Sequence, residues 1–155
     1  MVKKLSDLLE VTDVLANSVD INTEITGLVI DSRKVKPGDL FIAIKGGQSD
    51  GHKYLNQALE NGAVAVLVTD GRSEVESEMI SLRWEDGLLG KLANVYYDYP
   101  SEKLTVIGIT GTNGKTTVGT ILYQAIVASG AKCGLISTVK IIIGEEEFPS
   151  ELTTP

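Results

Sequence analysis

A glycine-rich loop followed by a lysine and two threonines is the part of this sequence whose residues most clearly suggest chemistry. The run reads Gly111-Thr112-Asn113-Gly114-Lys115-Thr116-Thr117. Glycines permit a tight turn, and the backbone N–H groups at the start of a following helix attract anions. Lys115 would add a cation at the outer phosphates of a nucleotide, and the Thr116 hydroxyl would bind Mg²⁺. The run therefore predicts a phosphate-binding loop.

The loop departs at one position from the common pattern G-x-x-x-x-G-K-S/T. That pattern expects glycine where this chain has Ile109, whereas glycine stands one place earlier, at Gly108, and again inside the loop, at Gly111. The alternative is an ordinary glycine-rich turn that carries a surface lysine. The apolar residues before the loop and the helical pattern after it favour the phosphate-binding loop.

The elements around the loop are predicted to follow a β-loop-α-β order. We expect a strand over 104–109, a helix over 115–129 that ends at Gly130, and a strand over 132–138 that 139–143 continue toward a turn at Gly144. This order predicts the start of a Rossmann-like P-loop ATPase domain with a parallel sheet, over residues 102–155. Such a sheet usually has about five strands covered on both faces, so we expect a longer parent protein.

The first 101 residues predict a small mixed α/β domain. Their apolar patterns predict helices over 5–9, 52–60 and 85–97, strands over 25–31, 39–44, 63–69 and 79–82, and a type II turn at 36–39. The apolar run at 63–69 has the length of a buried parallel strand. Residues 99–102, Tyr-Pro-Ser-Glu, are the predicted linker. The predicted fold class is therefore α/β, with a second, P-loop region after this domain.

Composition narrows the classes of function. The chain has 155 residues, 43% of them hydrophobic, and a net charge of −7, which disfavours nucleic acid and anionic membranes as partners. One cysteine and one histidine exclude an intrachain disulfide and a histidine cluster. Glu145 to Glu147 suggest an exposed edge more than a metal site. Because no signal peptide or membrane span is recognisable, we expect a cytoplasmic protein.

Three separated segments resemble the Mur ligases of peptidoglycan synthesis. They are Asp-Ser-Arg-Lys-Val-Lys-Pro-Gly-Asp-Leu-Phe-Ile-Ala at 31–43, the loop Gly-Thr-Asn-Gly-Lys-Thr-Thr at 111–117, and Leu-Thr-Thr-Pro at 152–155. Their order and spacing also match, and the resemblance covers nearly the whole chain. The first segment favours the MurE or MurF branch of that family, and the last favours MurE.

The resemblance implies an ATP-dependent ligase. ATP would phosphorylate the D-Glu carboxylate of UDP-N-acetylmuramoyl-L-Ala-D-Glu to an acyl phosphate, and the amine of a diamino acid, diaminopimelate or lysine, would displace the phosphate. Lys115 would be the catalytic residue at the β and γ phosphates, and Thr116 the Mg²⁺ ligand. Gly111, Thr112, Asn113, Gly114 and Thr117 would complete the ATP site.

The resemblance also assigns substrate-binding residues. Ser32 matches the family's contact with uridine diphosphate, and Gly47, Gln48 and Ser49 lie in the loop that touches the uridine moiety. Thr153 and Thr154 match the pair that holds the muramoyl peptide. In isolation Ser32 is as well explained by a turn beside Asp31, and the two threonines by an ordinary extended segment before proline.

The sequence leaves two alternatives for the type of protein and predicts two properties of residues 1–155. The parent could be another Mur-type ligase, such as the MurF branch, or the chain could be a nucleotide-binding fragment without catalysis. Since the residues that select the incoming amino acid would lie beyond Pro155, we expect residues 1–155 to be inactive alone. An interrupted sheet would also leave an unpaired edge, which predicts self-association.

Overall fold

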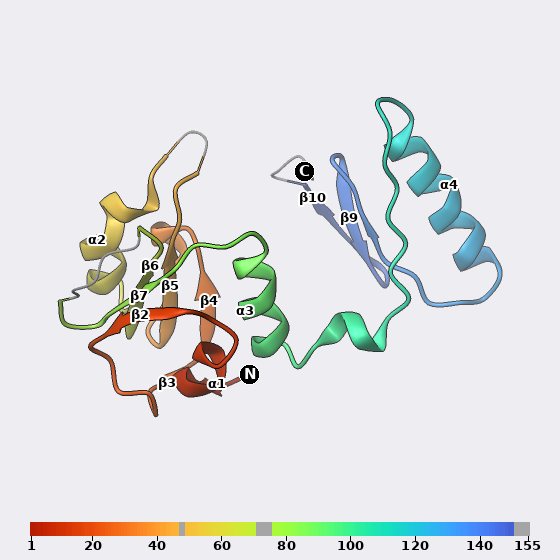
Figure 1. Cartoon of the computed structure of the whole chain (residues 1–155). Helices are drawn as coiled ribbons and strands as arrows, with labels where there is room; N and C mark the ends of the chain where they lie inside the picture. Colours follow the sequence, from red (N-terminus) through yellow and green to blue (C-terminus); the bar gives the residue numbers. More distant parts are fainter. Residues whose placement is uncertain (47–48, 71–75, 151–155) are drawn as a thin grey trace. The chain divides into compact units, whose positions relative to one another are not determined.

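The structure, a computed structural model, describes residues 1–46, 49–70 and 76–150 (Figure 1). It divides into two compact units, Met1–Thr105 and Val106–Pro155. The division falls just after the predicted linker at 99–102, where a short 3-10 helix, η3 (Pro100–Lys103), follows the chain's last helix of the first unit.

Unit 1, Met1–Thr105, is built on a five-stranded sheet in the order β2-β7-β6-β5-β4. Its strands are β2 (Val14–Asn17), β4 (Gly27–Val29), β5 (Asp39–Ala43), β6 (Ala65–Val68) and β7 (Met79–Leu82). Strands β4 to β7 run parallel, and β2 joins the β7 edge antiparallel. The α/β class and the parallel strands predicted from the apolar runs are confirmed.

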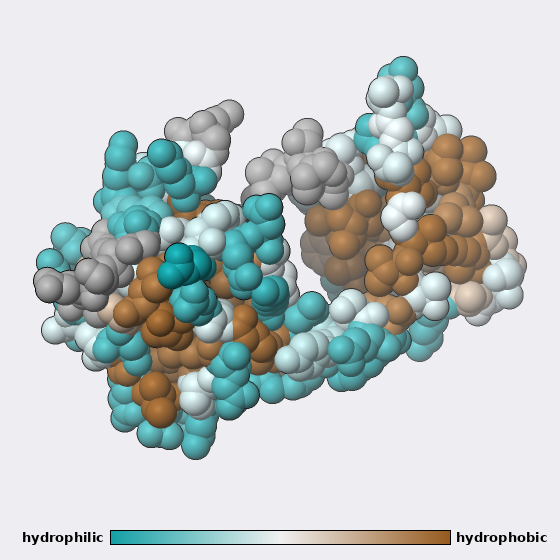
Figure 2. Space-filling model, in the orientation of Figure 1, coloured by the Kyte–Doolittle hydropathy of each residue, from teal (hydrophilic) through white to brown (hydrophobic). Residues whose placement is uncertain are grey.

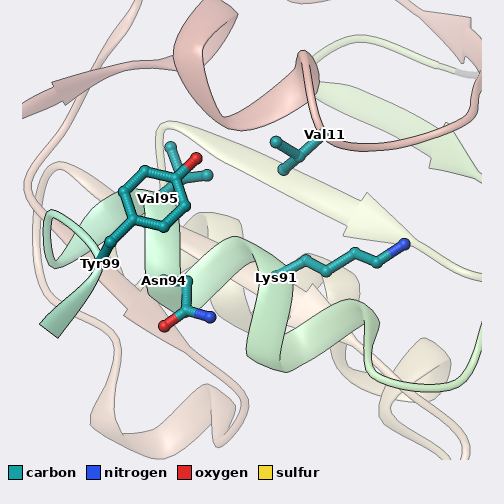
Figure 3. Close-up of a pocket in the computed structure, with 5 residues that line it drawn as sticks. All are labelled: Val11, Lys91, Asn94, Val95 and Tyr99. Carbon is teal, nitrogen blue, oxygen red and sulfur yellow. The ribbon is translucent and has the colours of Figure 1, made fainter. Parts of the chain in front are cut away.

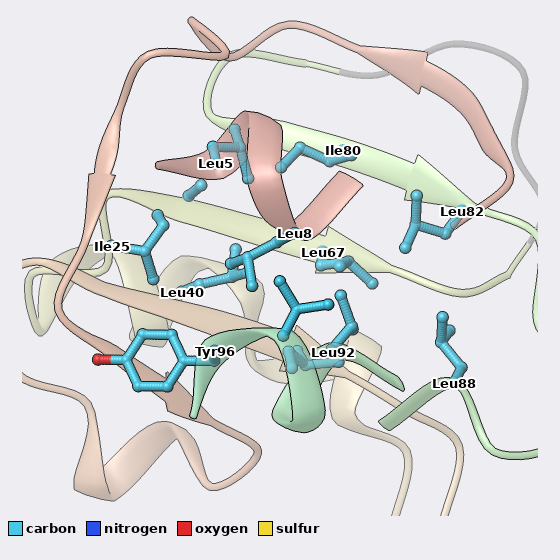
Figure 4. Close-up of a cluster of buried hydrophobic side chains, with 13 residues drawn as sticks. Leu5, Leu8, Ile25, Leu40, Leu67, Ile80, Leu82, Leu88, Leu92 and Tyr96 are labelled. Carbon is cyan, nitrogen blue, oxygen red and sulfur yellow. The ribbon is translucent and has the colours of Figure 1, made fainter. Parts of the chain in front are cut away.

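Helices cover both faces of this sheet. Strand side chains alternate between faces, so Leu40 and Ile42 pack with α1 (Leu5–Leu9) and α3 (Leu88–Tyr96). Figure 4 shows Leu40 between these two helices. Phe41 and Ala43 face the other way, onto α2 (Leu55–Glu60). The continuous apolar character of β5 and β6 follows from this burial on both sides.

Local chemistry explains where several predicted elements end. The strand predicted over 25–31 is split into β3 (Glu24–Ile25), which pairs with β1 (Lys3–Lys4), and β4 in the main sheet. Between them Thr26 N donates to Gly38 O at 2.9 Å. The predicted turn at 36–39 is confirmed by the bond from Asp39 N to Lys36 O at 3.1 Å and by φ of 95° at Gly38.

Two helices begin later than predicted. The helix expected over 52–60 starts as a 3-10 turn, η2 (Gly51–Tyr54), because the Asp50 side chain caps His52 N, and α2 follows. The helix expected over 85–97 begins only at Leu88 because Gly87 has φ of 83°, which a right-handed helix excludes.

Unit 2, Val106–Pro155, contains one long helix and an antiparallel sheet. Helix α4 (Lys115–Ala128) follows the glycine-rich loop, and the chain turns at Gly130 as predicted. The strands β8 (Leu135–Ile136), β9 (Lys140–Ile143) and β10 (Glu146–Pro149) form a sheet in the order β10-β9-β8.

The strand predicted over 104–109 is wrong. These residues form no strand in the structure, and β8 pairs with β9 in antiparallel fashion and with no parallel neighbour among the described residues. A strand needs a neighbour that pairs its backbone N–H and C=O groups. The described strands of unit 2 offer residues 104–109 no such pairing, so the predicted β-loop-α-β arrangement lacks its first strand. Of the strand predicted over 132–138 only β8 forms, and residues 140–143 do not continue it but turn back as the antiparallel strand β9.

Candidate functional site

The predicted phosphate-binding run forms a loop and the first turn of α4. Gly111 has φ of 151° and Gly114 has φ of 78°, and α4 begins at the next residue, Lys115. A left-handed glycine directly before the helix lets the chain enter it with the amides of the loop and the first turn in sequence. The structure therefore brings Gly111 to Thr117 together at one helix N-terminus.

The backbone amides of this loop are open to a ligand. Within the described chain, the N–H groups of Thr112 to Thr117 donate no hydrogen bond, and the first backbone bond of the helix runs from Val118 N to Gly114 O at 2.9 Å. Unpaired amides and the helix dipole together give this end of α4 a partial positive charge. The arrangement is suited to bind an anion.

The side chains at the loop add a cation and hydroxyl groups. Lys115 Nζ folds back and donates to Gly111 O at 2.6 Å. Thr116 Oγ1 lies 3.3 Å from Thr138 Oγ1, which stands in the turn between β8 and β9. Thr138 is not among the predicted site residues. It lies 22 positions from Thr116 in the sequence, so no local sequence pattern links the two residues.

The donor set at the loop fits Mg²⁺ held together with a nucleotide. No group of three His, Cys, Asp or Glu side chains suited to hold a metal exists among the described residues. Mg²⁺ in nucleotide sites needs no such cage, since it keeps several waters and binds substrate phosphates with one or two protein oxygens. The Thr116 hydroxyl, at the first turn of α4, is such an oxygen.

The predicted uridine-site residues come from the carboxyl ends of two neighbouring parallel strands. Ser32 opens the 3-10 turn η1 (Ser32–Lys34) after β4, and the loop that contains Ser49 follows β5. Strands β4 and β5 pair directly in parallel. Ligands of open α/β sheets bind at this edge. Gly47 and Gln48 lie outside the described residues.

Ser32 is buried, and both its hydroxyl group and its carbonyl oxygen make a hydrogen bond. It is 6% exposed, its Oγ donates to Gln57 Oε1 at 2.7 Å, and Asn61 Nδ2 donates to its carbonyl oxygen at 2.8 Å. Gln57 lies in α2, and Asn61 ends that helix. Sequence reasoning missed both amide residues, because their pairing with Ser32 spans 25 and 29 positions along the chain.

An ion pair flanks Ser32. Arg33 Nε donates to Asp31 Oδ1 at 2.9 Å and Arg33 Nη2 donates to Asp31 Oδ2 at 2.8 Å. The hydrogen bonds from the Arg33 side chain and from its backbone N–H lower the pKa of Asp31 to about 2. The two-pronged pair holds the guanidinium on the Asp31 carboxylate, although the Arg33 side chain remains 79% exposed.

A histidine joins the loop after β5 to the end of β6. His52 Nδ1 lies 2.7 Å from Asp50 Oδ1, and Thr69 N donates to His52 Nε2 at 3.1 Å. Because Nε2 accepts a backbone N–H, the neutral ring carries its proton on Nδ1 and donates it to Asp50. Hydrogen bonds from His52 lower the pKa of Asp50. The single histidine is therefore a structural link at this edge.

Ser49, the described member of the predicted uridine loop, makes local contacts. Its carbonyl oxygen accepts from Gly46 N at 2.9 Å, and its Oγ lies 3.3 Å from Tyr54 Oη. Lys45 and Asp50 form an isolated β-bridge that closes the base of the loop. The loop is thereby held at both ends, beside the segment that His52 anchors.

Other features of the structure lie away from these residues. A pocket of 310 Å³ in unit 1 is lined by Val11, Lys91, Asn94, Val95 and Tyr99, none of them a predicted site residue (Figure 3). Thr153 and Thr154 lie outside the described residues. Among the helices of the described chain, none has the length and apolar character to span a bilayer.

Comparisons with known proteins agree with the segments that suggested a family. The model of the Mur ligase family, catalytic domain, matches residues 24–97. A UDP-N-acetylmuramoyl-L-alanyl-D-glutamate–2,6-diaminopimelate ligase of Clostridioides difficile is 41% identical over 152 residues, which are 98% of this chain and 31% of that protein. Its counterpart in Listeria monocytogenes is 40% identical over 152 residues, with the same shares of 98% and 31%.

Solved structures agree at the level of the fold. MurF from Acinetobacter baumannii superposes with a TM-score of 0.62 at 27% identity, over 83% of this chain and 28% of that one. A UDP-N-acetylmuramoyl-L-alanyl-D-glutamate–2,6-diaminopimelate ligase gives a TM-score of 0.68 at 22% identity, over 99% of this chain and 31% of its own. The chain thus spans about a third of the length of these relatives, and over nearly the whole of its own length it is similar to Mur ligases.

Proposed function

We propose that this chain is part of an ATP-dependent ligase of the MurE type, which adds a diamino acid to UDP-N-acetylmuramoyl-L-Ala-D-Glu. The names of its relatives in Clostridioides difficile and Listeria monocytogenes, both 2,6-diaminopimelate ligases, favour diaminopimelate over lysine as the added amino acid. The uridine-linked dipeptide and the amino acid are the proposed partners, at a cytoplasmic location and without nucleic acid or a membrane.

The observation that carries the proposal is the row of unpaired amides from Thr112 to Thr117 at the start of α4. Six successive backbone donors beside a lysine suit the polyphosphate of ATP. Lys115 would exchange its bond to Gly111 O for the outer phosphates, and the Thr116 hydroxyl would hold Mg²⁺. Bound Mg²⁺ supplies charge neutralisation at the transferring phosphoryl group.

The proposed reaction needs groups that stabilise negative charge on the transferring phosphate, and the loop before α4 supplies them. A D-Glu carboxylate oxygen attacks the γ-phosphorus, the bond to the β-phosphate breaks, and the amine later displaces phosphate from the acyl phosphate. Negative charge shifts toward the β-phosphate during transfer, so fixed N–H groups and the Lys115 ammonium stabilise the transition state more than the ground state. Lys115 is the catalytic residue of this proposal.

The uridine moiety is proposed to bind at the carboxyl edge of β4 and β5. Ser32 and the loop after β5 follow two neighbouring parallel strands at this edge, and Arg33, the residue after Ser32, is paired with Asp31. Gly47, Gln48 and Ser49 remain predicted contacts of the uridine, and Thr153 and Thr154 remain predicted contacts of the muramoyl peptide. Residues 1–155 alone are expected to bind both nucleotides without completing the reaction.

Calorimetric titration tests the proposal with two ligands and two variants. Lys115→Ala is expected to weaken binding of Mg·ATP by about tenfold or more, since hydrogen bonds to charged groups contribute about 1.5–3 kcal/mol, and to leave the uridine-linked dipeptide unaffected. Ser32→Ala is expected to do the reverse. Lys132→Ala and Ser101→Ala, at exposed positions of units 2 and 1, are the matched controls.

The outcomes separate the candidate functions. Loss of the uridine ligand in Ser32→Ala alone, and of Mg·ATP in Lys115→Ala alone, supports a two-site ligase. If Mg·ATP binds and the uridine-linked dipeptide does not, a different phosphate-loop enzyme is the better interpretation. Failure of the wild-type chain to bind either ligand contradicts the proposal.

A MurF-type ligase is the second candidate, favoured by the structural similarity to MurF from Acinetobacter baumannii at 27% identity. A MurF-type parent would accept the uridine-linked tripeptide in place of the dipeptide. Titration with both compounds therefore discriminates between the candidates, and tighter binding of the tripeptide would favour MurF.

A further inference from the structure

Helix α2 presents two amide side chains to Ser32. Gln57 and Asn61 lie four positions apart, the spacing that places side chains on one helix face. Gln57 Oε1 accepts from the Ser32 hydroxyl at 2.7 Å, and Asn61 Nδ2 donates to the Ser32 carbonyl oxygen at 2.8 Å. Both the side chain and the backbone of Ser32 are therefore held by the same helix.

The direction of the hydroxyl bond determines what Ser32 offers to a ligand. A serine hydroxyl has one proton to donate and two lone pairs to accept with. Because the proton is directed at Gln57 Oε1, the lone pairs of Oγ are what remain. An oxygen that presents lone pairs repels an unprotonated phosphate oxygen and attracts an N–H or O–H group.

We propose that Gln57 and Asn61 are positioning residues of the uridine site, and that Gln57 makes Ser32 Oγ an acceptor for a ligand N–H or O–H group. In a uridine nucleotide these donors are the N–H of the base and the ribose hydroxyls, so Ser32 reads the nucleoside and leaves the diphosphate to other groups. The inference rests on the proposed uridine binding at this edge of the sheet.

Substitutions of Gln57 and Asn61 in the whole chain test it, with UDP as the calorimetric probe. Gln57→Leu removes the acceptor and frees the Ser32 proton to rotate toward the ligand, so the affinity for UDP is expected to fall about tenfold. Gln57→Glu keeps an acceptor and is expected to restore affinity to within about threefold of its charge control. That control is Asn56→Asp, which adds the same charge to an exposed position of α2.

A second control excludes a general effect of the leucine. Gln124→Leu makes the same change at an exposed position of α4 in unit 2 and is expected to bind UDP as the wild type does. Asn61→Leu is expected to weaken UDP binding about threefold to tenfold, because the Ser32 backbone loses its partner. Thermal unfolding of each variant establishes that the folded state persists.

The outcomes distinguish this inference from the proposed function. If wild type binds UDP and Gln57→Leu binds equally well, or if Gln57→Glu is as weak as Gln57→Leu, the inference is overturned while the uridine site stands. If the wild-type chain does not bind UDP, both fall. Tight binding by Gln57→Leu with weak binding by Gln57→Glu would show that Ser32 donates to the ligand, which also overturns the inference.

Discussion

The two units of this chain differ in how completely they bury their hydrophobic residues. In unit 1, Leu40, Phe41 and Val66 are fully buried between helices on both faces of the sheet. In unit 2, Ile142 is the one buried hydrophobic residue of the described part. Figure 2 shows hydrophobic residues gathered on the visible surface of unit 2.

Helices α3 and α4 differ in the same way in how far their apolar side chains are buried. Both carry apolar stripes, but α3 buries Leu88, Leu92, Val95 and Tyr96 against the sheet, whereas Val118 and Ile121 of α4 are 52% and 61% exposed. A helix forms from local signals, while its stripe is covered only when a sheet lies beneath it. The glycine-rich loop at 111–114 needs only the local signals, which explains why it forms before α4 although few side chains of unit 2 are buried.

The largest expected effect comes from the core of unit 1. Leu40→Ala removes a fully buried side chain from β5 and is expected to lower the free energy of unfolding by about 2–5 kcal/mol. Ile121→Ala in α4 is expected to change it by less than about 0.5 kcal/mol. Urea unfolding followed by the fluorescence of Trp84, the single tryptophan, reports on unit 1. Hydrogen exchange measured by mass spectrometry reports on both units.

The effect of Ile121→Ala on stability decides whether the two units differ in burial. If Ile121→Ala destabilised the chain as strongly as Leu40→Ala, helix α4 would have to be buried in solution, and the contrast between the units would disappear.

The exposed apolar surface of unit 2 is expected to drive self-association. Ile136, which is 71% exposed in β8, is a suitable position to interrupt it. Ile136→Lys is expected to raise the dissociation constant of the self-associated form about tenfold or more, because burial of such a side chain contributes about 1.5–3 kcal/mol. Sedimentation velocity across a concentration series measures this.

The matched control lies in unit 1. Ile30 is 52% exposed, and Ile30→Lys is expected to leave self-association unchanged. A chain that stays monomeric at every concentration, or one that Ile30→Lys dissociates equally well, would contradict a specific role for unit 2.

Residues with local signals were predictable, and those that depend on distant partners were not. Gly111, Gly114 and Lys115 identify the loop because glycine permits the observed φ values and a following helical pattern continues directly. The strand expected over 104–109 has the right residues, yet no described strand of unit 2 pairs with it. Sequence patterns describe what a segment favours, and pairing depends on which neighbours are present.

The site shows the same division. The resemblance to Mur ligases selected Ser32, but nothing near it in the sequence indicates that Gln57 and Asn61 hold it, because those contacts form only when α2 packs against η1. The late start of α3 was readable in principle, since Gly87 interrupts the helical pattern and has φ of 83°. A glycine before an apolar stripe is more useful as a helix boundary than as a weak helical residue.

Glycines before α3 and α4 allow one substitution to be compared across the two units. Gly87 and Gly114 have φ of 83° and 78°, and an added Cβ would meet nothing within 4 Å at either position. Gly87→Ala is therefore expected to cost about 1–2 kcal/mol in unit 1 through backbone strain alone. Gly114→Ala carries the same strain and is expected to weaken Mg·ATP binding with little change in the unfolding of unit 1.

Gly90→Ala is the control, and its expected change in stability has the opposite sign to that of Gly87→Ala. Gly90 lies inside α3 with nothing within 4 Å of an added Cβ, so alanine is expected to stabilise unit 1 by up to about 1 kcal/mol. Thermal unfolding of the three variants measures the changes in stability, and calorimetric titration measures the binding of Mg·ATP by Gly114→Ala. Equal destabilisation by Gly90→Ala and Gly87→Ala would contradict the assignment of strain to the positive φ.

The smallest expected effect is the acid sensitivity that Asp31 gives to unit 1. Arg33 lowers the pKa of the folded Asp31 from an ordinary 3.8 to about 2. The unfolded chain therefore binds the proton more readily, so the contribution of this carboxylate to stability is full above pH 3.8 and is lost as the pH falls toward 2. Asp31→Asn should destabilise unit 1 at pH 5 and lose that difference near pH 2. Urea unfolding at the two pH values tests this, with Asp86→Asn at an exposed position as the control. If the free energy of unfolding differed between wild type and Asp31→Asn by the same amount at both pH values, the ion pair would not govern the titration of Asp31.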